Sequence, residues 1–268
     1  MAAIRRDRAR NRSKDRADDM VCESDSTSGD WPTVLHVTHA KAGSQWIHKI
    51  LHYCASDRIV TPQYGMVQFL QVPVRSGAIY PTLYLTRQEL DQVVLPSNSR
   101  RFVIIRDLRD TLVSWYFSVK VSHAIDHPIT LEHRVALKAR SLEDGLIWCA
   151  ENAGFGRCAD IQRSWYDSGE RLIRYEELLK RDEEVLTRLL LDECGLPIGR
   201  AHLRAAVHAC RFERLTGRSP GVENVSSHER KGIAGDWRNY FTDRVKDVFK
   251  DRFGLLLLAT GYESDPDW

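Results

Sequence analysis

Short apolar runs alternate along the chain with stretches in which apolar residues recur at helical spacing. The apolar runs lie at residues 34–38, 102–105 and 171–175. After the first run, helical spacing is carried by Trp46, Ile47, Ile50, Leu51 and Cys54. A short apolar run is typical of a buried strand, and apolar residues three and four positions apart are typical of an amphipathic helix. Strands that alternate with helices predict an α/β fold built around a parallel sheet.

The same pattern divides the chain into a polar tail and one domain. Further helices are expected within residues 130–165, 176–194 and 200–212. Residues 56–100 mix prolines, glycines and aromatic residues without a clear period. Residues 1–30 are charged and polar, with nothing to bury, which predicts disorder. We therefore expect a disordered tail over residues 1–30 and a single domain over residues 31–268.

The composition limits which binding partners and which cellular compartment we expect. The chain has 268 residues and a formal net charge of +2, whereas a dedicated nucleic-acid-binding protein would show a clear basic excess. No apolar run approaches the ~20 residues of a membrane span, and early arginines interrupt any signal-peptide core. The 6 cysteines form no C-x-x-C pair and read as reduced thiols. We expect a cytoplasmic protein with no transmembrane segment and no nucleic-acid partner.

Polar residues follow each predicted strand, at the sheet edge where ligands of parallel sheets bind. They are Lys41 to Ser44, Arg106 to Ser114, and Tyr175 with Glu176. In the first loop, Lys41 and the start of the following helix offer positive charge and backbone N–H groups, which suit a phosphate. The loop is not a Walker A motif, because it lacks that motif's order of glycines and lysine. An ordinary strand-to-helix turn with an exposed lysine is the alternative.

Four segments resemble motifs of one known family. The first, residues 38–46, reads T-H-A-K-A-G-S-Q-W. It resembles the T-Y-P-K-S-G-T-T-W loop of the cytosolic-type sulfotransferases, which use 3′-phosphoadenosine 5′-phosphosulfate (PAPS). Residues 106–117 look like its R-x-x-[RK]-D-x-x-x-S-x-Y-x-F segment, and residues 174–178 look like its Y-E-D-L strand end. Residues 230–242 are similar to its R-K-G-x-x-G-x-W-K-x-x-F-T signature. The four segments follow one another in the family's order.

The resemblance implies a three-layer α/β/α fold with a central, mostly parallel sheet, similar to that of P-loop NTPases. It also implies in-line transfer of a sulfuryl group from PAPS to a hydroxyl, or less favourably an amine, of a small-molecule or lipid acceptor. The desulfated nucleotide PAP is then the second product. The family needs no metal, and the sequence has no persuasive carboxylate-rich Mg²⁺ site, because Asp107 and Asp110 are more simply helix caps.

The resemblance further implies which residues bind the nucleotide. The 5′ end would be held by Lys41, Ala42, Gly43, Ser44 and Gln45, and Trp46 would face the adenine unless it is a core residue. The 3′-phosphate would be held by Arg106, Ser114, Arg230, Lys231 and Gly232, and Tyr175 would lie near the adenine. Lys41 would also contact the bridging oxygen and the leaving phosphate. Two separated anion sites fit a nucleotide that carries phosphate at both ends, and arginine suits phosphate through paired hydrogen bonds.

The sequence departs from the family at the catalytic base. The family places a histidine in a K-T-H-x-P stretch, where this chain has Tyr84. His123 is the first substitute, because imidazole titrates near neutral pH, and Tyr84 is the second, with its ordinary pKa near 10 as a handicap. His127 and His39 stay open as alternatives. An acceptor that ionises on its own would need no strong base.

Assembly and the acceptor are less readable. The family's dimer motif K-x-x-x-T-V-x-x-x-E corresponds to residues 238–247 here, and Asp243 replaces the motif's valine. That dimer contact is therefore not expected, and the oligomeric state stays open.

Aromatic and apolar residues suggest an acceptor with apolar parts, and the candidate lining residues are Tyr64, Met66, Phe69, Tyr80, Tyr84, Phe117 and Trp148. Two alternatives to a sulfuryl-transfer function remain. One is a degenerate nucleotide-binding protein without turnover, and the other is an ATP-dependent kinase on a P-loop-like fold.

Overall fold

A parallel sheet forms the centre of the protein. The computed structural model describes residues 31–62, 70, 72–124, 128–152 and 154–268, so the expected disordered tail at residues 1–30 lies outside the described residues. The strands are β1 (Thr33–Thr38), β2 (Ile79–Leu83), β3 (Ser99–Ile105) and β4 (Leu172–Arg174), in the order β2-β1-β3-β4. Every neighbouring pair is parallel. The three predicted strands are confirmed as β1, β3 and β4.

The strand β2 lies within the stretch that gave no sequence period. Its sequence is I-Y-P-T-L, and all of its residues are buried, so apolar and polar positions do not alternate. Pro81 lacks the backbone N–H that a central strand needs, but β2 ends the sheet among the described strands. Beyond β1, it is bridged only at Ile79, by Ile59. His36 on β1 lies 2.6 Å from the Pro81 carbonyl through Nδ1, which ties the two strands together.

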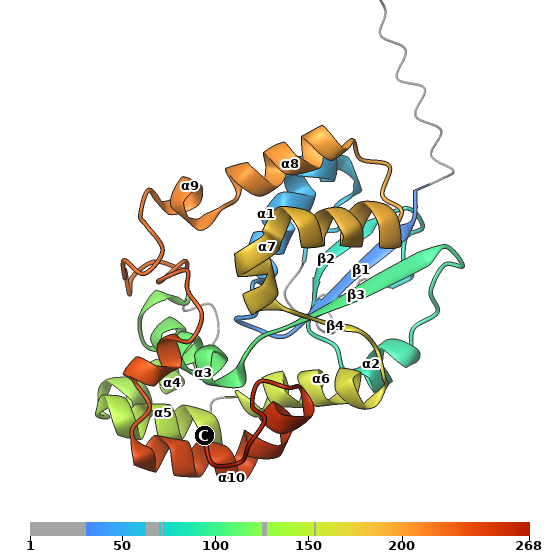
Figure 1. Ribbon diagram of the computed structural model, residues 1–268. Coiled ribbons are helices and arrows are strands. Elements are labelled where there is room, and N and C mark those ends of the chain that lie inside the picture. Colours follow the sequence, from blue (N-terminus) through green and yellow to red (C-terminus); the bar gives the residue numbers. More distant parts are fainter. Residues whose placement is uncertain (1–30, 63–69, 71, 125–127, 153) are drawn as a thin grey trace, which may run out of the picture.

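Helices cover one face of the sheet (Figure 1). They are α1 (Ser44–Ala55), α7 (Tyr175–Thr187) with its π-helical continuation η4 (Arg188–Glu193), and α8 (Arg200–Ala209). Ile50 of α1, Leu186 of α7 and Leu203 of α8 belong to one buried cluster with Val34 and Ile104 of the sheet. The expected helix at residues 176–194 is confirmed in α7 and η4.

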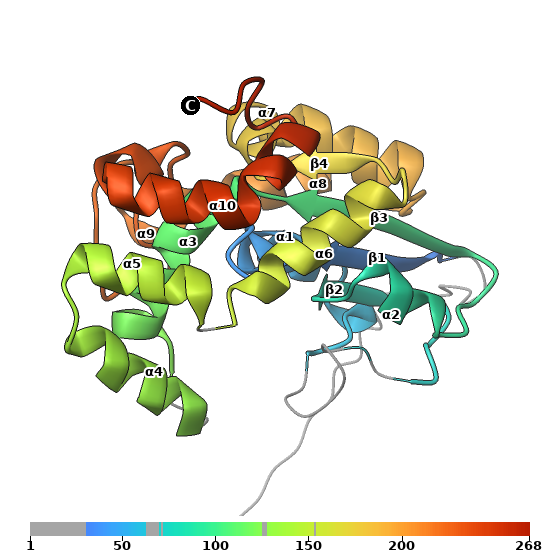
Figure 2. The same ribbon diagram turned by 90° about the horizontal axis from the view of Figure 1, so that it is seen from below.

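The opposite face is covered by α6 (Gly156–Asp167) and the short α2 (Arg87–Asp91) (Figure 2). Trp165 of α6 is fully buried in a cluster with Leu35 and Val103 of the sheet. Its indole N–H donates a 2.7 Å hydrogen bond to the Leu85 carbonyl, which satisfies the one polar atom of this large side chain. Helices therefore lie on both faces, and the expected three-layer α/β/α architecture is confirmed.

A helical group packs beside the carboxyl ends of the strands (Figure 1). It contains α3 (Leu108–Phe117) with its π-helical continuation η3 (Ser118–Ser122), α4 (Pro128–Lys138), α5 (Leu142–Glu151) and α10 (Asp243–Ala259). Two short helices, α9 (Phe212–Thr216) and η5 (Asp236–Asn239), flank the segment that carries Arg230. A third, η1 (Ser56–Arg58), follows α1. None of the described helices has the length and apolar character needed to cross a bilayer.

Candidate active site

The loop from β1 to α1 forms one half of the site. Lys41 has a positive φ of 69°, an uncommon conformation for a residue other than glycine, and Gly43 follows with φ 89° as the N-cap of α1. The first turn of a helix leaves backbone N–H groups without an intrahelical partner, so the residues after Gly43 present donors to an anion. Ala42 and Ser44 are buried, whereas Gln45 is exposed.

Gly43 is required because the loop lies against Tyr175, the first residue of α7. A Cβ at position 43 would lie 2.8 Å from the Tyr175 ring. The same ring lies edge-on to Trp46, with ring centroids 6.1 Å apart. Trp46 is half-buried, and its indole nitrogen has no hydrogen-bond partner within the described part of the chain. Tyr175 and Trp46 are thus brought together with the loop, as the sequence implied.

Lys41 reaches from this loop toward the end of α3. Its Nζ donates a 3.1 Å hydrogen bond to Oγ of Ser118, the first residue of η3. Burial, and next the positive charge of Arg106, lower the pKa of Lys41 to about 8. The ammonium is therefore poorly solvated and lies among other cations, an environment that a bound anion would relieve.

Arg106 connects the loop to the second half of the site. Its Nη1 donates to the Lys41 carbonyl at 2.9 Å, and its Nη2 donates to the Ile233 carbonyl at 3.4 Å. Its guanidinium carbon lies 4.7 Å from the Tyr175 ring centroid. The Nε atom of Arg106 is buried and has no hydrogen-bond partner among the described residues. An orphaned buried donor at this point fits a site that a ligand completes.

Arg230 and Lys231 form the second half of the site and share one carboxylate. Arg230 Nη2 lies 2.6 Å from Asp236 Oδ2, and Lys231 Nζ lies 2.7 Å from Asp236 Oδ1. Burial opposes the charge of Arg230, but the hydrogen bonds that it donates to Asp236 and Glu223 raise its pKa. Both cations therefore stay charged and are held in place before any ligand binds.

Backbone geometry supports the same segment. Gly232 has a φ of 65°, and a Cβ at this position would lie 2.5 Å from the ring of Phe212, so only glycine fits. Asp110 of α3 accepts hydrogen bonds from the backbone N–H groups of Gly235 at 2.6 Å and Trp237 at 2.9 Å. We expected Asp107 and Asp110 to cap α3. Asp107 is the N-cap of α3, whereas Asp110 binds the segment that follows Arg230 to α3 through these two hydrogen bonds.

Ser114 lies on α3, four residues before Ser118. Residues four apart share one face of a helix, so Ser114 lies on the face that Lys41 approaches. Its side chain is half-buried.

Tyr84, which stands at the position of the family's histidine, lies beside the loop from β1 to α1. The Tyr84 hydroxyl is 2.9 Å from Oγ of Ser44, the first residue of α1. The Tyr84 carbonyl accepts a 3.1 Å hydrogen bond from Arg157 of α6, which holds the backbone beyond β2 in place. The structure therefore brings Tyr84 together with the predicted phosphate-binding loop.

The histidines considered as bases differ in their placement. The backbone N–H of His123, at the end of η3, donates a 2.7 Å hydrogen bond to the carbonyl of Ser118, the residue that Lys41 contacts. His39 is fully buried, with Nδ1 2.9 Å from the Ala40 carbonyl and Nε2 accepting the Arg106 N–H at 3.3 Å. Both ring nitrogens of His39 are thus occupied by backbone, and it is not placed to act on a substrate. His127 lies outside the described residues.

Sequence reasoning missed four residues of this region. Lys49 of α1 forms a 2.6 Å ion pair with Glu229, next to Arg230. His228 precedes that glutamate, and Phe212 packs against Gly232. The sequence signal for His228 and Glu229 was their place directly before the R-K-G signature. Their pairing with α1 depends on tertiary structure, which no local pattern shows.

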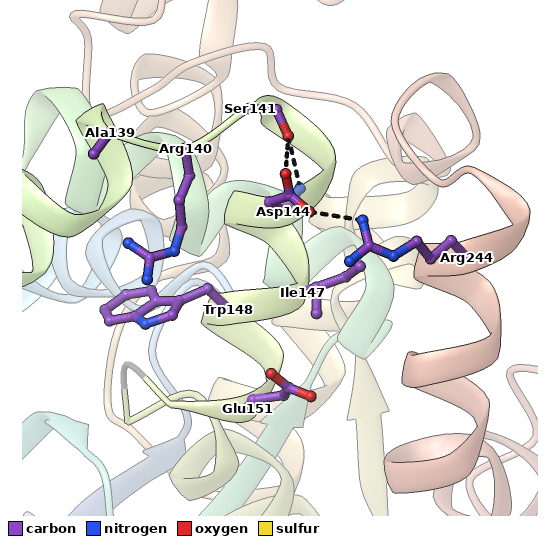
Figure 3. Close-up of a pocket in the computed structure, with 8 residues that line it drawn as sticks. All are labelled: Ala139, Arg140, Ser141, Asp144, Ile147, Trp148, Glu151 and Arg244. Carbon is purple, nitrogen blue, oxygen red and sulfur yellow. Dashed lines mark hydrogen bonds and ion pairs between the residues drawn. The ribbon is translucent and has the colours of Figure 1, made fainter.

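The expected lining residues separate into different environments. Tyr80 is 2% exposed and its hydroxyl accepts from the Arg75 N–H, so it belongs to the core. Phe117 lies beneath the Arg230 guanidinium at 4.6 Å. Trp148 lines a hollow of about 570 Å³ beside α5 and α10, where Arg140 covers its ring (Figure 3). Tyr64, Met66 and Phe69 lie outside the described residues. Within the described ranges, no group of three or more potential ligands could hold a metal ion.

Comparisons with known proteins identify one family for the chain. A family model described as a sulfotransferase domain matches residues 32–261. The chain is 23% identical to human sulfotransferase 1C2 over 257 residues, covering 85% of this chain and 83% of that protein. It is 24% identical to mouse sulfotransferase 1B1 over 273 residues, covering 90% and 87%. The crystal structure of mouse sulfotransferase SULT7A1 complexed with PAP matches with a TM-score of 0.58 at 20% identity, covering 87% of this chain and 89% of that one.

Proposed function

Since the chain belongs to the sulfotransferase domain family, we propose that it transfers a sulfuryl group from PAPS to a hydroxyl of a small-molecule or lipid acceptor and releases PAP. The single observation that carries this proposal is the position of Arg106 between two cationic half-sites. One guanidinium nitrogen contacts the carbonyl of Lys41 and another contacts the carbonyl of Ile233, next to the Arg230 segment. A nucleotide with phosphate at both ends matches such a pair of sites.

The half-sites suit the two ends of PAPS differently. The Lys41 loop offers backbone donors at a helix N-terminus and one poorly solvated ammonium, which fits the 5′-phosphosulfate. Arg230 and Lys231 offer charged side-chain donors, which fit the terminal 3′-phosphate through charge-assisted hydrogen bonds. ATP carries its phosphates at one end only, so a kinase would have no use for the second half-site.

Lys41 and the loop would act on the leaving group. In the reaction, the acceptor oxygen bonds to sulfur while the bond from sulfur to the bridging oxygen breaks. The electron pair of that bond goes to the oxygen of the 5′-phosphate, where Lys41 and the N–H groups of α1 stabilise the new charge. The acceptor proton leaves to a base, for which the candidates are Tyr84, whose hydroxyl lies beside Ser44, and His123, whose backbone N–H donates to the Ser118 carbonyl. We place Tyr84 as the residue that orients the acceptor hydroxyl.

Calorimetric titration with PAP tests the proposal directly. We expect PAP to bind at micromolar concentration or tighter without metal, and ATP and 5′-AMP to bind at least tenfold more weakly. Transfer from ³⁵S-labelled PAPS to a panel of phenols and alcohols then tests turnover. Equal affinity for PAP and ATP would overturn two-phosphate recognition, and tight PAP binding without transfer to any acceptor would favour a nucleotide-binding protein without turnover.

A further inference from the structure

Arg109, the second residue of α3, is buried between two tryptophan rings. Its side chain is 2% exposed, and its guanidinium carbon lies 4.0 Å from the ring centroid of Trp237 and 4.3 Å from that of Trp268. The two tryptophan rings stand edge to face, with centroids 5.5 Å apart. A cation–π contact is stronger where the cation is shielded from water. Arg109 therefore joins α3 to η5, which carries Trp237, and to the chain after α10, which carries Trp268.

Two carboxylates hold the same guanidinium. Nη2 of Arg109 donates a 2.8 Å hydrogen bond to Oδ2 of Asp107, the N-cap of α3. Nη1 donates to Oε1 of Glu263, which follows α10. A buried cation that loses one of its carboxylate partners is left poorly compensated. Residues 260–268, which we call the anchor segment, thus supply two of the side chains that surround Arg109, from Glu263 and Trp268.

The anchor segment also contacts both chain neighbours of Tyr175. The Thr260 carbonyl accepts a 2.7 Å hydrogen bond from Nη2 of Arg174. The Tyr262 hydroxyl donates a 2.9 Å hydrogen bond to Oε2 of Glu176. The segment therefore holds the start of α7, where Tyr175 lies against the loop from β1 to α1.

The other contacts of the anchor segment are also adjacent to residues of the proposed nucleotide site. On α3, the N-cap Asp107 directly follows Arg106 in the chain. On η5, Trp237 directly follows Asp236, whose carboxylate pairs with Arg230 at 2.6 Å. The segment thus contacts the elements that carry the two half-sites, at positions one residue away from the groups that would bind phosphate or hold a phosphate-binding cation.

We propose that the anchor segment is a positioning element of the nucleotide site, an inference that rests on the proposed function. Trp268 holds Arg109 against Trp237 and thereby fixes η5 on α3. The two half-sites are then kept at one spacing, which a nucleotide with phosphate at both ends requires. Docking of the segment therefore favours the arrangement that can bind PAP, and the apparent affinity rises with the share of molecules in that arrangement. The family model matches residues 32–261, so Trp268 lies beyond the matched part of the chain.

Calorimetric titration of Trp268→Ala with PAP tests the proposal on the full chain. Trp268 is half-buried, so the variant should fold. Asp110 still binds the N–H groups of Gly235 and Trp237 to α3, so η5 should shift without detaching. We expect PAP affinity to fall by about 5- to 50-fold, within the usual range of coupling between sites, while kcat at saturating PAPS stays within about threefold. Trp268→Phe, which keeps a ring over Arg109, should recover most of the affinity.

Trp31→Ala is the matched control. Trp31 is also a half-buried tryptophan that pairs with an arginine, since the guanidinium carbon of Arg58 lies 5.1 Å from its ring centroid. It stands before the first residue of β1, whereas the proposed site lies at the carboxyl end of that strand. This variant loses a similar contact and should leave PAP affinity unchanged. Unchanged affinity in Trp268→Ala, or an equal loss in Trp31→Ala, overturns the proposal.

Hydrogen–deuterium exchange measures the same coupling from the side of the segment. If docking of the anchor segment favours PAP binding, PAP must favour docking by the same factor. The backbone N–H groups of Tyr262 and Glu263 donate to the Leu257 carbonyl, so their exchange reports opening of the segment. We expect saturating PAP to slow their exchange by about 5- to 50-fold in the unaltered protein, and by less in Trp268→Ala. Slowing that is absent, or that only equals the slowing at amides of α8, overturns the proposal.

PAP binding by the unaltered protein separates this inference from the proposed function. If the unaltered protein binds no PAP, the proposed function fails and the inference fails with it. If the unaltered protein binds PAP and Trp268→Ala binds it equally well, the inference alone fails.

Discussion

Nη1 of Arg106 donates a 2.9 Å hydrogen bond to the backbone carbonyl of Lys41, so the side chain of one half-site fixes the backbone of the other. The positive φ of Lys41 is an uncommon backbone conformation for this residue type, and the Arg106 contact helps to maintain it. The two cationic half-sites are therefore built as one unit. Variants in the two halves should nevertheless have different effects, because only Lys41 lies at the proposed reacting end.

Lys41→Ala should mainly lower turnover. Removing a donor that stabilises charge in the transition state typically costs about 10²–10³-fold in kcat. Backbone donors of the loop and the Arg230 half-site remain, so PAP affinity should fall by less than about tenfold. Steady-state kinetics and calorimetry on the same preparation would measure the two effects. A loss of PAP affinity as large as the loss of kcat would contradict the separate role of Lys41.

Arg230→Ala should mainly weaken nucleotide binding. The change removes a charge-assisted donor and leaves Asp236 and Glu223 with one cation fewer, so PAP affinity should fall by about 10- to 100-fold. At saturating PAPS, kcat should change by less than about fivefold. Arg244→Ala is a suitable control, since Arg244 also pairs with two carboxylates but its side chain on α10 is 59% exposed. Unchanged PAP affinity in Arg230→Ala would contradict the second half-site.

Acid should destabilise the fold through His36. Burial lowers the pKa of His36 to about 4, although its contact with the Pro81 carbonyl opposes this shift. The unfolded chain then binds a proton below pH ~6.5, whereas the folded chain binds one only near pH 4. Stability is therefore fully present above pH ~6.5 and is lost as the pH falls toward 4, by about 2–3 kcal/mol at pH 4.5 from this one group.

Urea unfolding of the unaltered protein and of His36→Gln, each at pH 7 and pH 4.5, would isolate this contribution. The difference in unfolding free energy between the two pH values should be about 2–3 kcal/mol smaller in His36→Gln. His202→Gln should keep the full difference. If His36→Gln loses as much stability in acid as the unaltered protein, His36 does not drive the effect.

The sequence predicts the sheet and much of the site, because both depend on local patterns. Apolar runs give β1, β3 and β4, and the polar residues after them meet at one sheet edge, which brings Lys41 and Arg106 together. The strand β2 escapes prediction because a proline interrupts it and all of its residues are buried, so it shows no alternation. Propensity and period describe a strand's own residues, whereas the burial of β2 comes from its neighbours.

The remaining parts of the site depend on contacts between distant segments. Asp110 has the position of a helix-capping residue in the sequence, yet its carboxylate binds two N–H groups more than a hundred residues away. Glu229 stands in a polar stretch with no periodicity, and its ion pair with Lys49 reveals its relation to α1. Such residues are found from packing and charge, and not from spacing along the chain.

Tyr84→Phe should lower turnover without weakening nucleotide binding. The hydroxyl of Tyr84 lies 2.9 Å from Oγ of Ser44, and its removal leaves the ring, the loop and the cationic half-sites in place. If Tyr84 orients the acceptor hydroxyl, the variant should raise KM for the acceptor and lower kcat, each by about 3- to 30-fold, from the loss of one hydrogen bond of about 1–2 kcal/mol. PAP affinity should stay within about threefold.

Tyr53→Phe is the matched control, because Tyr53 is a half-exposed tyrosine on α1 at 49% exposure and contacts His202 of α8. It should leave KM, kcat and PAP affinity unchanged. Acceptor kinetics at saturating PAPS, measured with 2-naphthol, would separate the two outcomes. A Tyr84→Phe enzyme with unchanged KM and kcat would show that the hydroxyl serves only the loop, and the acceptor would then be oriented by other groups near Lys41.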